Sequence, residues 1–105
     1  MSEKYYVYIL ECSNGSFYTG CAKDLKKRYD DHLNGRGSCK YTRSFPPLRI
    51  AASWSLEGGR RDAMRVESFI KRHRRNTKEA LIERPQLLTK MVKEKLGTEV
   101  DVFTS

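Results

Sequence analysis

Residues 5–20 of this chain read YYVYILECSNGSFYTG, and this stretch decides the fold. Residues 5–11 are aromatic and β-branched, a composition that favours a strand. Residues 16–20 predict a second, shorter strand, and the Ser-Asn-Gly sequence at residues 13–15 predicts a hairpin turn between the two. The chain is therefore expected to begin with a β-hairpin that carries a tyrosine tripeptide on each strand.

The type of turn decides whether the tyrosines of the two tripeptides lie on the same face. A two-residue loop would pair Glu11 with Tyr18 and leave Tyr8 and Tyr18 on opposite faces of the hairpin. A three-residue loop, with Gly15 left-handed in a G1 bulge, would pair Tyr8 with Gly20 and bring both tyrosines to one face. If the tyrosines act together, the bulged turn is required, and this is our hypothesis.

The first predicted helix carries two polar residues where apolar ones are expected. Asp24 is a good N-cap for a helix that runs to about Leu33. At helical spacing, Arg28 and His32 fall on or beside the apolar stripe that should face the core. Two polar side chains in that position need a reason beyond solubility.

The rest of the chain predicts an α+β fold: a small three-stranded, mostly antiparallel sheet flanked by helices, in the order strand–strand–helix–strand–helix–helix. Glu67 lies at the edge of the apolar stripe of the second helix. We expect residues 1–84 to form one domain and residues 85–105 to form a C-terminal helical extension and loose tail. The expected elements are a long basic loop at 35–47, a strand at Leu48–Leu56, helices at Arg61–Arg74, Thr77–Glu83 and 86–95, and a loose segment from Gly97 to Ser105.

Composition bounds the function without naming it. The 105 residues suffice for one modest core, and the net charge of +8 is concentrated in residues 21–78, which hold sixteen Lys/Arg and six Asp/Glu. A basic middle indicates a polyanion partner, although a merely soluble basic surface explains the charge equally well. Three cysteines without a CxxC pair favour free thiols over a disulfide framework or a zinc site. Without a signal-like or membrane-length apolar segment, we expect a cytoplasmic protein.

The order of the two tripeptides, Tyr6-Val7-Tyr8 and Tyr18-Thr19-Gly20, resembles the GIY-YIG nuclease superfamily, whose name spells them. The downstream arginine and glutamate strengthen the likeness, which covers about Tyr5 to Ile82 and is to the small stand-alone, single-domain members. Two motif positions depart from the pattern: the first glycine is replaced by Tyr6, and Thr19 stands at the centre of the second motif. Neither change removes a catalytic group.

The resemblance implies a role for each of five catalytic side chains. Tyr8 would be the general base, and Tyr18 would lie beside the attacking water. Arg28 would bind the phosphate, His32 would assist, and Glu67 would hold one divalent metal, Mg²⁺ or Mn²⁺. The structural alternatives are core tyrosines, a satisfied buried histidine, an arginine at the helix rim and a glutamate in a surface ion pair.

Five further residues are candidates for substrate binding: Lys40, Tyr41, Arg43, Lys71 and Asn76. The first three belong to a basic segment with an interleaved aromatic residue, which suits contact with a nucleic-acid backbone and bases. A solvated connecting loop is the alternative for that segment, and a helix-junction cap is the alternative for Asn76.

Phosphodiester hydrolysis needs a base to activate water, positive charge on the phosphoryl oxygens and help for the leaving oxygen. The named residues and one metal ion could supply all three. We therefore expect a metal-dependent endonuclease acting on DNA, in branched, damaged or single-stranded form, in repair or recombination, with a protein partner able to supply specificity. The alternative is a non-catalytic nucleic-acid-binding or adaptor domain that retains the fold.

Overall fold

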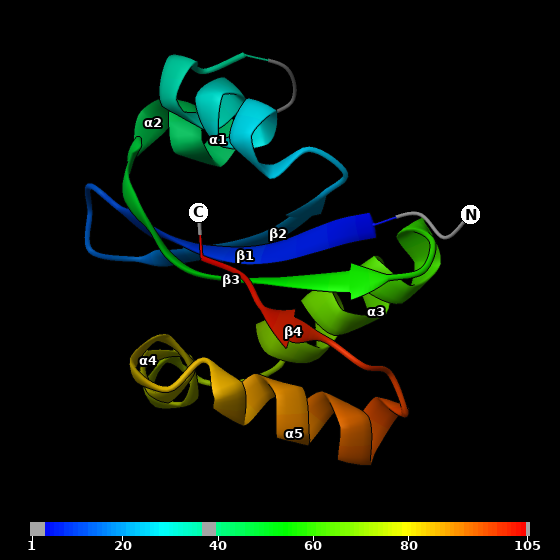
Figure 1. Ribbon diagram of the computed structural model, residues 1–105. Helices are drawn as coiled ribbons and strands as arrows, with labels where there is room; N and C mark the ends of the chain where they lie inside the picture. The colour runs from blue at the N-terminus through cyan, green and yellow to red at the C-terminus, as the bar shows by residue number, and fades with distance from the viewer. Residues whose placement is uncertain (1–3, 37–39, 105) are drawn as a thin grey trace.

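The computed structural model describes residues 4–36 and 40–104 and shows an α+β fold around one antiparallel sheet (Figure 1). Its four strands lie in the order β2-β1-β3-β4. The strands are β1 (Lys4–Cys12), β2 (Phe17–Ala22), β3 (Pro47–Glu57) and β4 (Asp101–Val102). The sequence predicts three strands, so the fourth strand is a correction.

The hairpin between β1 and β2 has the three-residue, bulged turn. Gly15 has a φ of +82°, and its N–H donates to the Cys12 carbonyl oxygen at 2.8 Å. Only glycine adopts this left-handed conformation without a steric cost. Leu10 pairs with Tyr18 and Tyr8 pairs with Gly20, which confirms the register that the bulged turn requires.

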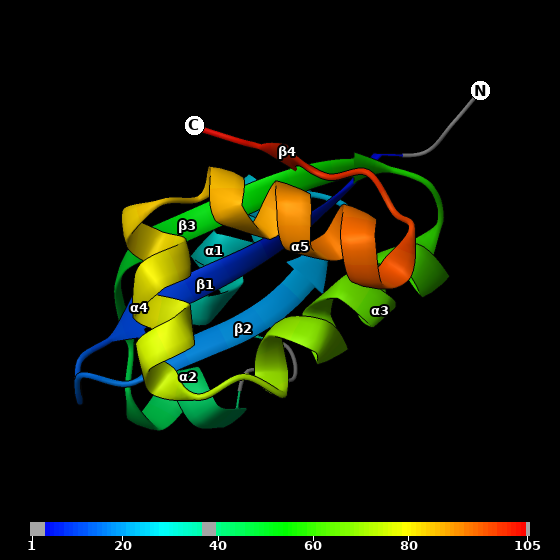
Figure 2. The same cartoon turned by 90° about the horizontal axis from the view of Figure 1, so that it is seen from below.

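The helices cover both faces of the sheet (Figures 1 and 2). One face carries α1 (Leu25–Asn34) and the short α2 (Lys40–Ser44). The other face carries α3 (Arg60–Lys71), α4 (Arg75–Glu83) and α5 (Gln86–Leu96).

Side chains of β1 alternate between the two cores because successive residues of a strand point to opposite faces. Val7 and Ile9 belong to the larger core, which also includes buried residues of α3, α4 and α5. Tyr8 and Leu10 belong to a smaller cluster with Leu25 of α1. The tyrosine that ends the first tripeptide therefore lies under α1, away from the main core.

The first predicted helix is confirmed in its bounds and its N-cap. The side chain of Asp24 accepts a hydrogen bond from the Lys27 N–H at 3.1 Å, and Gly35 ends the helix with a φ of +67°. The predicted basic loop at residues 35–47 is wrong over Lys40–Ser44, which form α2. Such a short helix has little propensity of its own, and its packing against the hairpin stabilises it.

The C-terminal segment is also more ordered than its sequence suggests. Val100 is fully buried, and β4 pairs with β3 through Trp54 and Val102, so the loose tail is wrong at these residues. The Trp54 indole N–H donates to the Pro85 carbonyl at 2.8 Å and ties the junction of α4 and α5 to the sheet. The division into residues 1–84 and 85–105 stays a prediction, although Leu88 of α5 lies in the main core. Among the described residues, no helix has the length and apolar character to cross a membrane.

Candidate active site

A pocket of about 480 Å³ opens between β1, β2, α1 and α3. It brings together Tyr8, Tyr18, Arg28 and Glu67, four of the five catalytic side chains that the sequence predicts, from four different elements. The fifth, His32, is fully buried and lies behind Tyr8. The complete lining comprises Tyr5, Tyr8, Tyr18, Gly20, Cys21, Ala22, Lys23, Arg28, Arg60, Met64 and Glu67.

The two tyrosine tripeptides meet in a single contact inside this pocket. Tyr8 is only 2% exposed, and its ring lies across the backbone of Gly20 on the neighbouring strand. A Cβ atom added at Gly20 would lie 2.6 Å from the Tyr8 hydroxyl oxygen, well inside van der Waals contact. Gly20 is therefore needed for space, because only a residue without a side chain lets the tyrosine ring occupy this position.

A chain of buried hydrogen bonds runs from Tyr8 to α2. The Tyr8 hydroxyl lies 3.0 Å from His32 Nε2, and His32 Nδ1 lies 2.8 Å from Thr42 Oγ1. Because the Arg28 guanidinium can only donate to the Tyr8 oxygen, the Tyr8 O–H is left to donate to Nε2. His32 is then assigned the Nδ1–H tautomer, which donates to Thr42. The position of His32 on the apolar face of α1 is thus explained, because both of its ring nitrogens have buried hydrogen-bond partners.

Burial moves both ionisable groups of this chain toward their neutral forms. It raises the pKa of Tyr8 far above the ordinary value, and the hydrogen bond and positive charge of Arg28 only partly oppose this shift. Burial, with the nearby Arg28 charge, lowers the pKa of His32 to about 4. At neutral pH the phenol is protonated and the imidazole is neutral, so Nε2 is free to accept the phenolic proton.

Aromatic side chains hold Tyr18 next to this hydrogen-bonded chain. Its ring packs edge-to-face against the His32 ring at 5.1 Å and stacks on the Tyr41 ring of α2 at 5.9 Å. Tyr41 is in turn held to the hairpin turn, because its hydroxyl hydrogen-bonds Asn14 at 3.0 Å and also Ser16. Through Tyr41, α2 contacts both Tyr18 and the turn that sets the register of the hairpin.

Glu67 places a carboxylate in the pocket and already has a cationic partner. Its Oε2 atom lies 2.7 Å from Lys71 Nζ, and the Glu67 side chain is 21% exposed. The same hydrogen bond raises the pKa of Lys71. Cys21 lies beside the carboxylate, and burial together with a hydrogen bond to Glu67 raises the pKa of its thiol to about 12. The thiol is therefore protonated at neutral pH and is a poor nucleophile.

The donor set fits a metal that needs few protein ligands. Across residues 4–36 and 40–104, no three His, Cys, Asp or Glu side chains lie close enough to hold a metal ion by themselves. Mg²⁺ commonly keeps several waters and takes one or two carboxylates together with substrate phosphate. Glu67, a single carboxylate at an open pocket, suits such an ion, whereas it would not suit zinc.

The predicted substrate-binding residues are more scattered. Lys40 and Arg43 are exposed on α2, and Lys71 reaches the pocket only through Glu67. Asn76 does not line the pocket; it lies in the first turn of α4, whose N-cap is Arg74, and its side chain accepts from the Thr77 N–H at 2.9 Å. The sequence did not predict a role for Cys21, Arg60 or Met64, and no local motif marks them, because each reaches the site through tertiary packing. Thr42 belongs to the predicted substrate-binding segment with Lys40, Tyr41 and Arg43, whereas its side chain hydrogen-bonds His32.

A family model described as the GIY-YIG catalytic domain matches residues 4–80. The chain belongs to the GIY-YIG family. This is a family of nucleases, so nucleic-acid binding is the general property that membership implies. In this GIY-YIG protein the two motifs lie on the adjacent strands β1 and β2, and their last residues, Tyr8 and Gly20, touch each other.

Relatives of this GIY-YIG protein are of similar size. The UPF0213 protein BH0048 of Halalkalibacterium halodurans is 44% identical over 78 residues, covering 74% of this chain and 81% of the relative. The UPF0213 protein FN1575 of Fusobacterium nucleatum is 41% identical over 86 residues, covering 82% and 84%. The solution NMR structure of UPF0213 protein BH0048 from Bacillus halodurans has a TM-score of 0.48 at 42% identity, covering 76% of this chain and 83% of that one. These names state neither a reaction nor a substrate.

Proposed function

We propose that this GIY-YIG protein is a metal-dependent endonuclease that hydrolyses phosphodiester bonds of DNA. The observation that carries the proposal is the convergence of Tyr8, Tyr18, Arg28 and Glu67 on one pocket, with the Tyr8 hydroxyl hydrogen-bonded to a neutral His32. The pocket with His32 behind it would supply groups for activating water, binding phosphate and anchoring a cation.

In this proposal Tyr8 and His32 act as a proton relay. As water attacks phosphorus, its proton moves to the Tyr8 oxygen while the phenolic proton moves to His32 Nε2 across the 3.0 Å hydrogen bond. Tyr8 ends the step neutral and His32 ends it protonated, so no free phenolate forms. The relay avoids a buried phenolate, which the raised pKa of Tyr8 disfavours, but the proton ends on His32, whose own pKa is lowered to about 4. The negative charge that develops on the phosphoryl group would have to stabilise the imidazolium. Thr42 fixes the imidazole through Nδ1.

Arg28 binds a non-bridging phosphoryl oxygen and keeps positive charge beside the Tyr8 hydroxyl. Tyr18 positions the attacking water at the mouth of the pocket. Glu67 would hold one Mg²⁺ or Mn²⁺, which, when bound, supplies further positive charge to the phosphoryl and leaving oxygens. Lys71 neutralises Glu67 until a cation takes its place.

The proposal also names a setting. The substrate would be branched, damaged or single-stranded DNA, in cytoplasmic repair or recombination, with a protein partner supplying specificity. The support is the small size of the catalytic pocket and the basic middle of the chain, which favour contact with phosphates over contact with base sequence.

The test is cleavage of supercoiled plasmid and of a labelled branched junction with Mg²⁺, with Mn²⁺ and with chelator. We expect metal-dependent cleavage that falls by about a hundredfold or more in Tyr8→Phe, the scale of a lost general base. Glu67→Gln should abolish the metal-dependent cleavage. Tyr29→Phe is the matched control, because it removes a tyrosine hydroxyl from α1 outside the pocket. Cleavage that survives chelator or Glu67→Gln would contradict the metal site.

The adaptor alternative is favoured by one observation, the deep burial of Tyr8 with its strongly raised pKa. It predicts DNA binding with no metal-dependent cleavage of any of these substrates. Binding that is unchanged by Tyr8→Phe, in a protein inactive with both metals, would favour it over the nuclease.

A further inference from the structure

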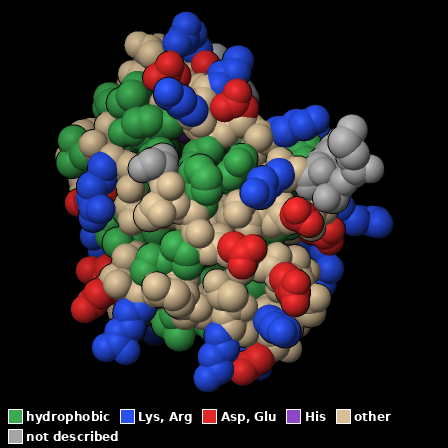
Figure 3. Space-filling model, in the orientation of Figure 1, with side chains coloured by type: hydrophobic (Ala, Val, Ile, Leu, Met, Phe, Trp, Pro, Cys, Tyr) green, Lys and Arg blue, Asp and Glu red, His purple; other side chains and the backbone are tan. Residues whose placement is uncertain are grey.

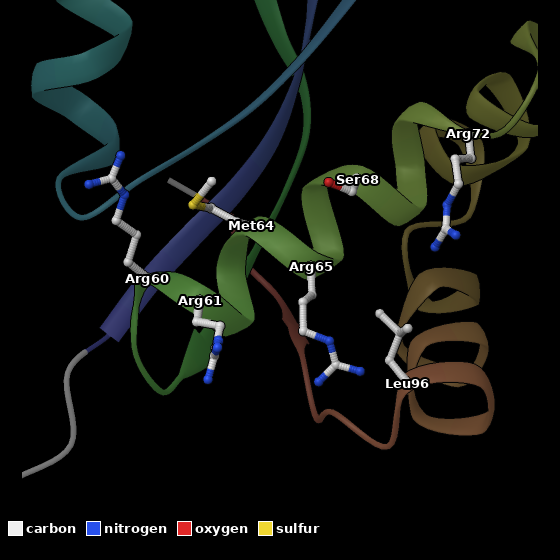
Figure 4. A pocket seen from close by; sticks show the side chains of 7 residues that line it. All are labelled: Arg60, Arg61, Met64, Arg65, Ser68, Arg72 and Leu96. Carbon is white, nitrogen blue, oxygen red and sulfur yellow. The ribbon is translucent and has the colours of Figure 1, made fainter.

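A second hollow, of about 780 Å³, lies along the outer side of α3 and reaches the C-terminal end of α5 (Figure 4). Four arginines line it: Arg60, Arg61, Arg65 and Arg72. Figure 4 shows Arg65 and Leu96 directed into the space between α3 and α5. None of the roles in the proposed reaction uses Arg61, Arg65 or Arg72.

This basic hollow is continuous with the catalytic pocket. Arg60 and Met64 line both of them, so the two hollows share a wall formed by the first turns of α3. In Figure 4 the Arg60 side chain extends away from α5, toward the end of β2. A chain molecule bound at Tyr8 and Glu67 could therefore continue over Arg60 onto the arginine face of α3 without leaving the surface.

The fold itself gives little reason for these arginines. The opposite face of α3 packs into the core through Ala63, Val66 and Ile70. The Arg72 guanidinium lies 5.9 Å from the centroid of the Phe69 ring, a contact that does not extend to Arg61 or Arg65. Cations in the first turn oppose the helix dipole, and like charges four residues apart, as at Arg61 and Arg65, repel each other. Such an arrangement is explained if an anion binds there.

The charges around the arginine face are largely uncompensated. Within the described part of the chain, none of the four arginines lies within 4 Å of a carboxylate oxygen; the observed ion pairs use other cations. Asp62 and Glu99 border Arg65 in a neighbouring hollow and mark one edge of the basic surface. By contrast, acidic and basic side chains are interspersed on the face seen in Figure 3.

We propose that the arginine face of α3 binds the phosphate backbone of the nucleic-acid strand that leaves the catalytic pocket. This inference rests on the proposed function, because it names the surface that holds the substrate beyond the scissile bond. At 1.5 Å per residue, the path from Arg60 to Arg72 is about 18 Å long, which spans about five phosphates of one strand in a duplex. Side chains at three positions along that path (Arg61, Arg65 and Arg72) would each neutralise about one phosphate.

The experiment measures binding without cleavage, so that it stands apart from the test of catalysis. Binding of a 20-base-pair duplex and of a 20-nucleotide single strand is measured in chelator between 50 and 200 mM salt. The variant changes Arg61, Arg65 and Arg72 to Gln; Arg60 is kept because it lines the catalytic pocket. The matched control changes Arg84, Lys90 and Lys95, three exposed cations that line neither hollow, to Gln.

We expect the dependence of log K on log salt to become shallower by about 2–3 in the α3 variant for at least one of the two ligands, and by less than about one in the control. For duplex DNA this means that raising salt fourfold weakens wild-type binding about 40-fold more than it weakens binding by the variant. The ligand whose salt dependence changes, duplex or single strand, identifies the form of the substrate. Arg61→Gln alone should lower the slope by about one and guards against misfolding of the triple variant.

Equal changes in the α3 variant and the control, or an unchanged slope for both ligands, would overturn the proposal. If metal-dependent cleavage is found, the α3 variant should show a raised KM with kcat retained, since its arginines do not touch the reacting atoms. A protein that never cleaves but shows the α3-dependent slope would overturn the proposed reaction and leave the binding surface in place.

Discussion

Replacement of Gly20 by alanine should disturb the active site through a single steric contact. The added Cβ would lie 2.6 Å from the Tyr8 hydroxyl oxygen and 2.8 Å from the ring carbon that bears it. Gly20 is not among the glycines with positive φ, so alanine fits its backbone conformation and the clash is the whole effect. The ring has little room to move, because Tyr8 is buried and tied to His32.

The expected cost has two parts. Overpacking at a buried site costs about 1–3 kcal/mol. Displacing the Tyr8 hydroxyl also leaves His32 Nε2 buried without its partner, at about 1–3 kcal/mol. Alanine also lowers the conformational entropy of the unfolded chain, which offsets about 0.4–1 kcal/mol of this destabilisation. We therefore expect Gly20→Ala to lower the free energy of unfolding by roughly 2–4 kcal/mol, and to slow cleavage.

The assay is urea unfolding followed by circular dichroism, in wild type and in a Tyr8→Phe background. In that background both the hydrogen bond and the nearest clashing atom, the hydroxyl oxygen, are absent, so Gly20→Ala should cost at least about 1–3 kcal/mol less. Gly59→Ala is the control, because nothing lies within 4 Å of its added Cβ, and it should cost less than about 1 kcal/mol. A Gly20→Ala cost below about 0.5 kcal/mol, or an equal cost in both backgrounds, would refute the steric argument.

Three further results should follow from the site. Because the pKa of folded His32 is about 4, the unfolded chain binds this proton first as the pH falls from about 6.5 to 4. The free energy of unfolding, measured by urea unfolding at each pH, should drop by roughly 3 kcal/mol over that range, and by less in His32→Gln. Equal drops in the two proteins would count against the buried neutral imidazole. Lys71→Met should strengthen Mn²⁺ binding by severalfold in calorimetry, because the Lys71 ammonium competes for Glu67; an unchanged affinity would show that it does not compete. Thr42→Val should lower the free energy of unfolding by about 1–3 kcal/mol, because it removes the acceptor of the His32 N–H. Thr19→Val is the control and should be neutral or stabilising, because the buried Thr19 hydroxyl has no hydrogen-bond partner among the described residues. Similar costs for the two variants would reject the proposed relay geometry.

Local sequence was sufficient for much of the framework. The turn at residues 13–15 limited the hairpin to two registers, and the bulged turn that we hypothesised is the one found, because a left-handed Gly15 adds the residue that shifts the pairing. The bounds of α1 follow from Asp24 and Gly35, which satisfy the free backbone groups at the two ends of the helix. The predictions of a basic loop and a loose tail failed at α2 and β4, where packing outweighs propensity. Both elements are too short to be stable alone, and neighbouring elements hold them in place.

The sequence by itself determined the two tripeptides and the presence of Arg28 and His32 on the inner side of α1, because helix periodicity fixes which side chains share a face. It allowed two hairpin registers, and the structure decided for the one that puts Tyr8 and Tyr18 on the same face. Only the tertiary structure decided that the Tyr8 hydroxyl lies against Gly20, that His32 links it to Thr42, and that Glu67, paired with Lys71 one helical turn away, lies at the same pocket. The reason is physical: burial, hydrogen-bond partners and the resulting pKa shifts depend on which elements pack together, and contacts between different elements leave no period in the sequence. The two tripeptides identify the family, and their contact in the folded chain creates the candidate site.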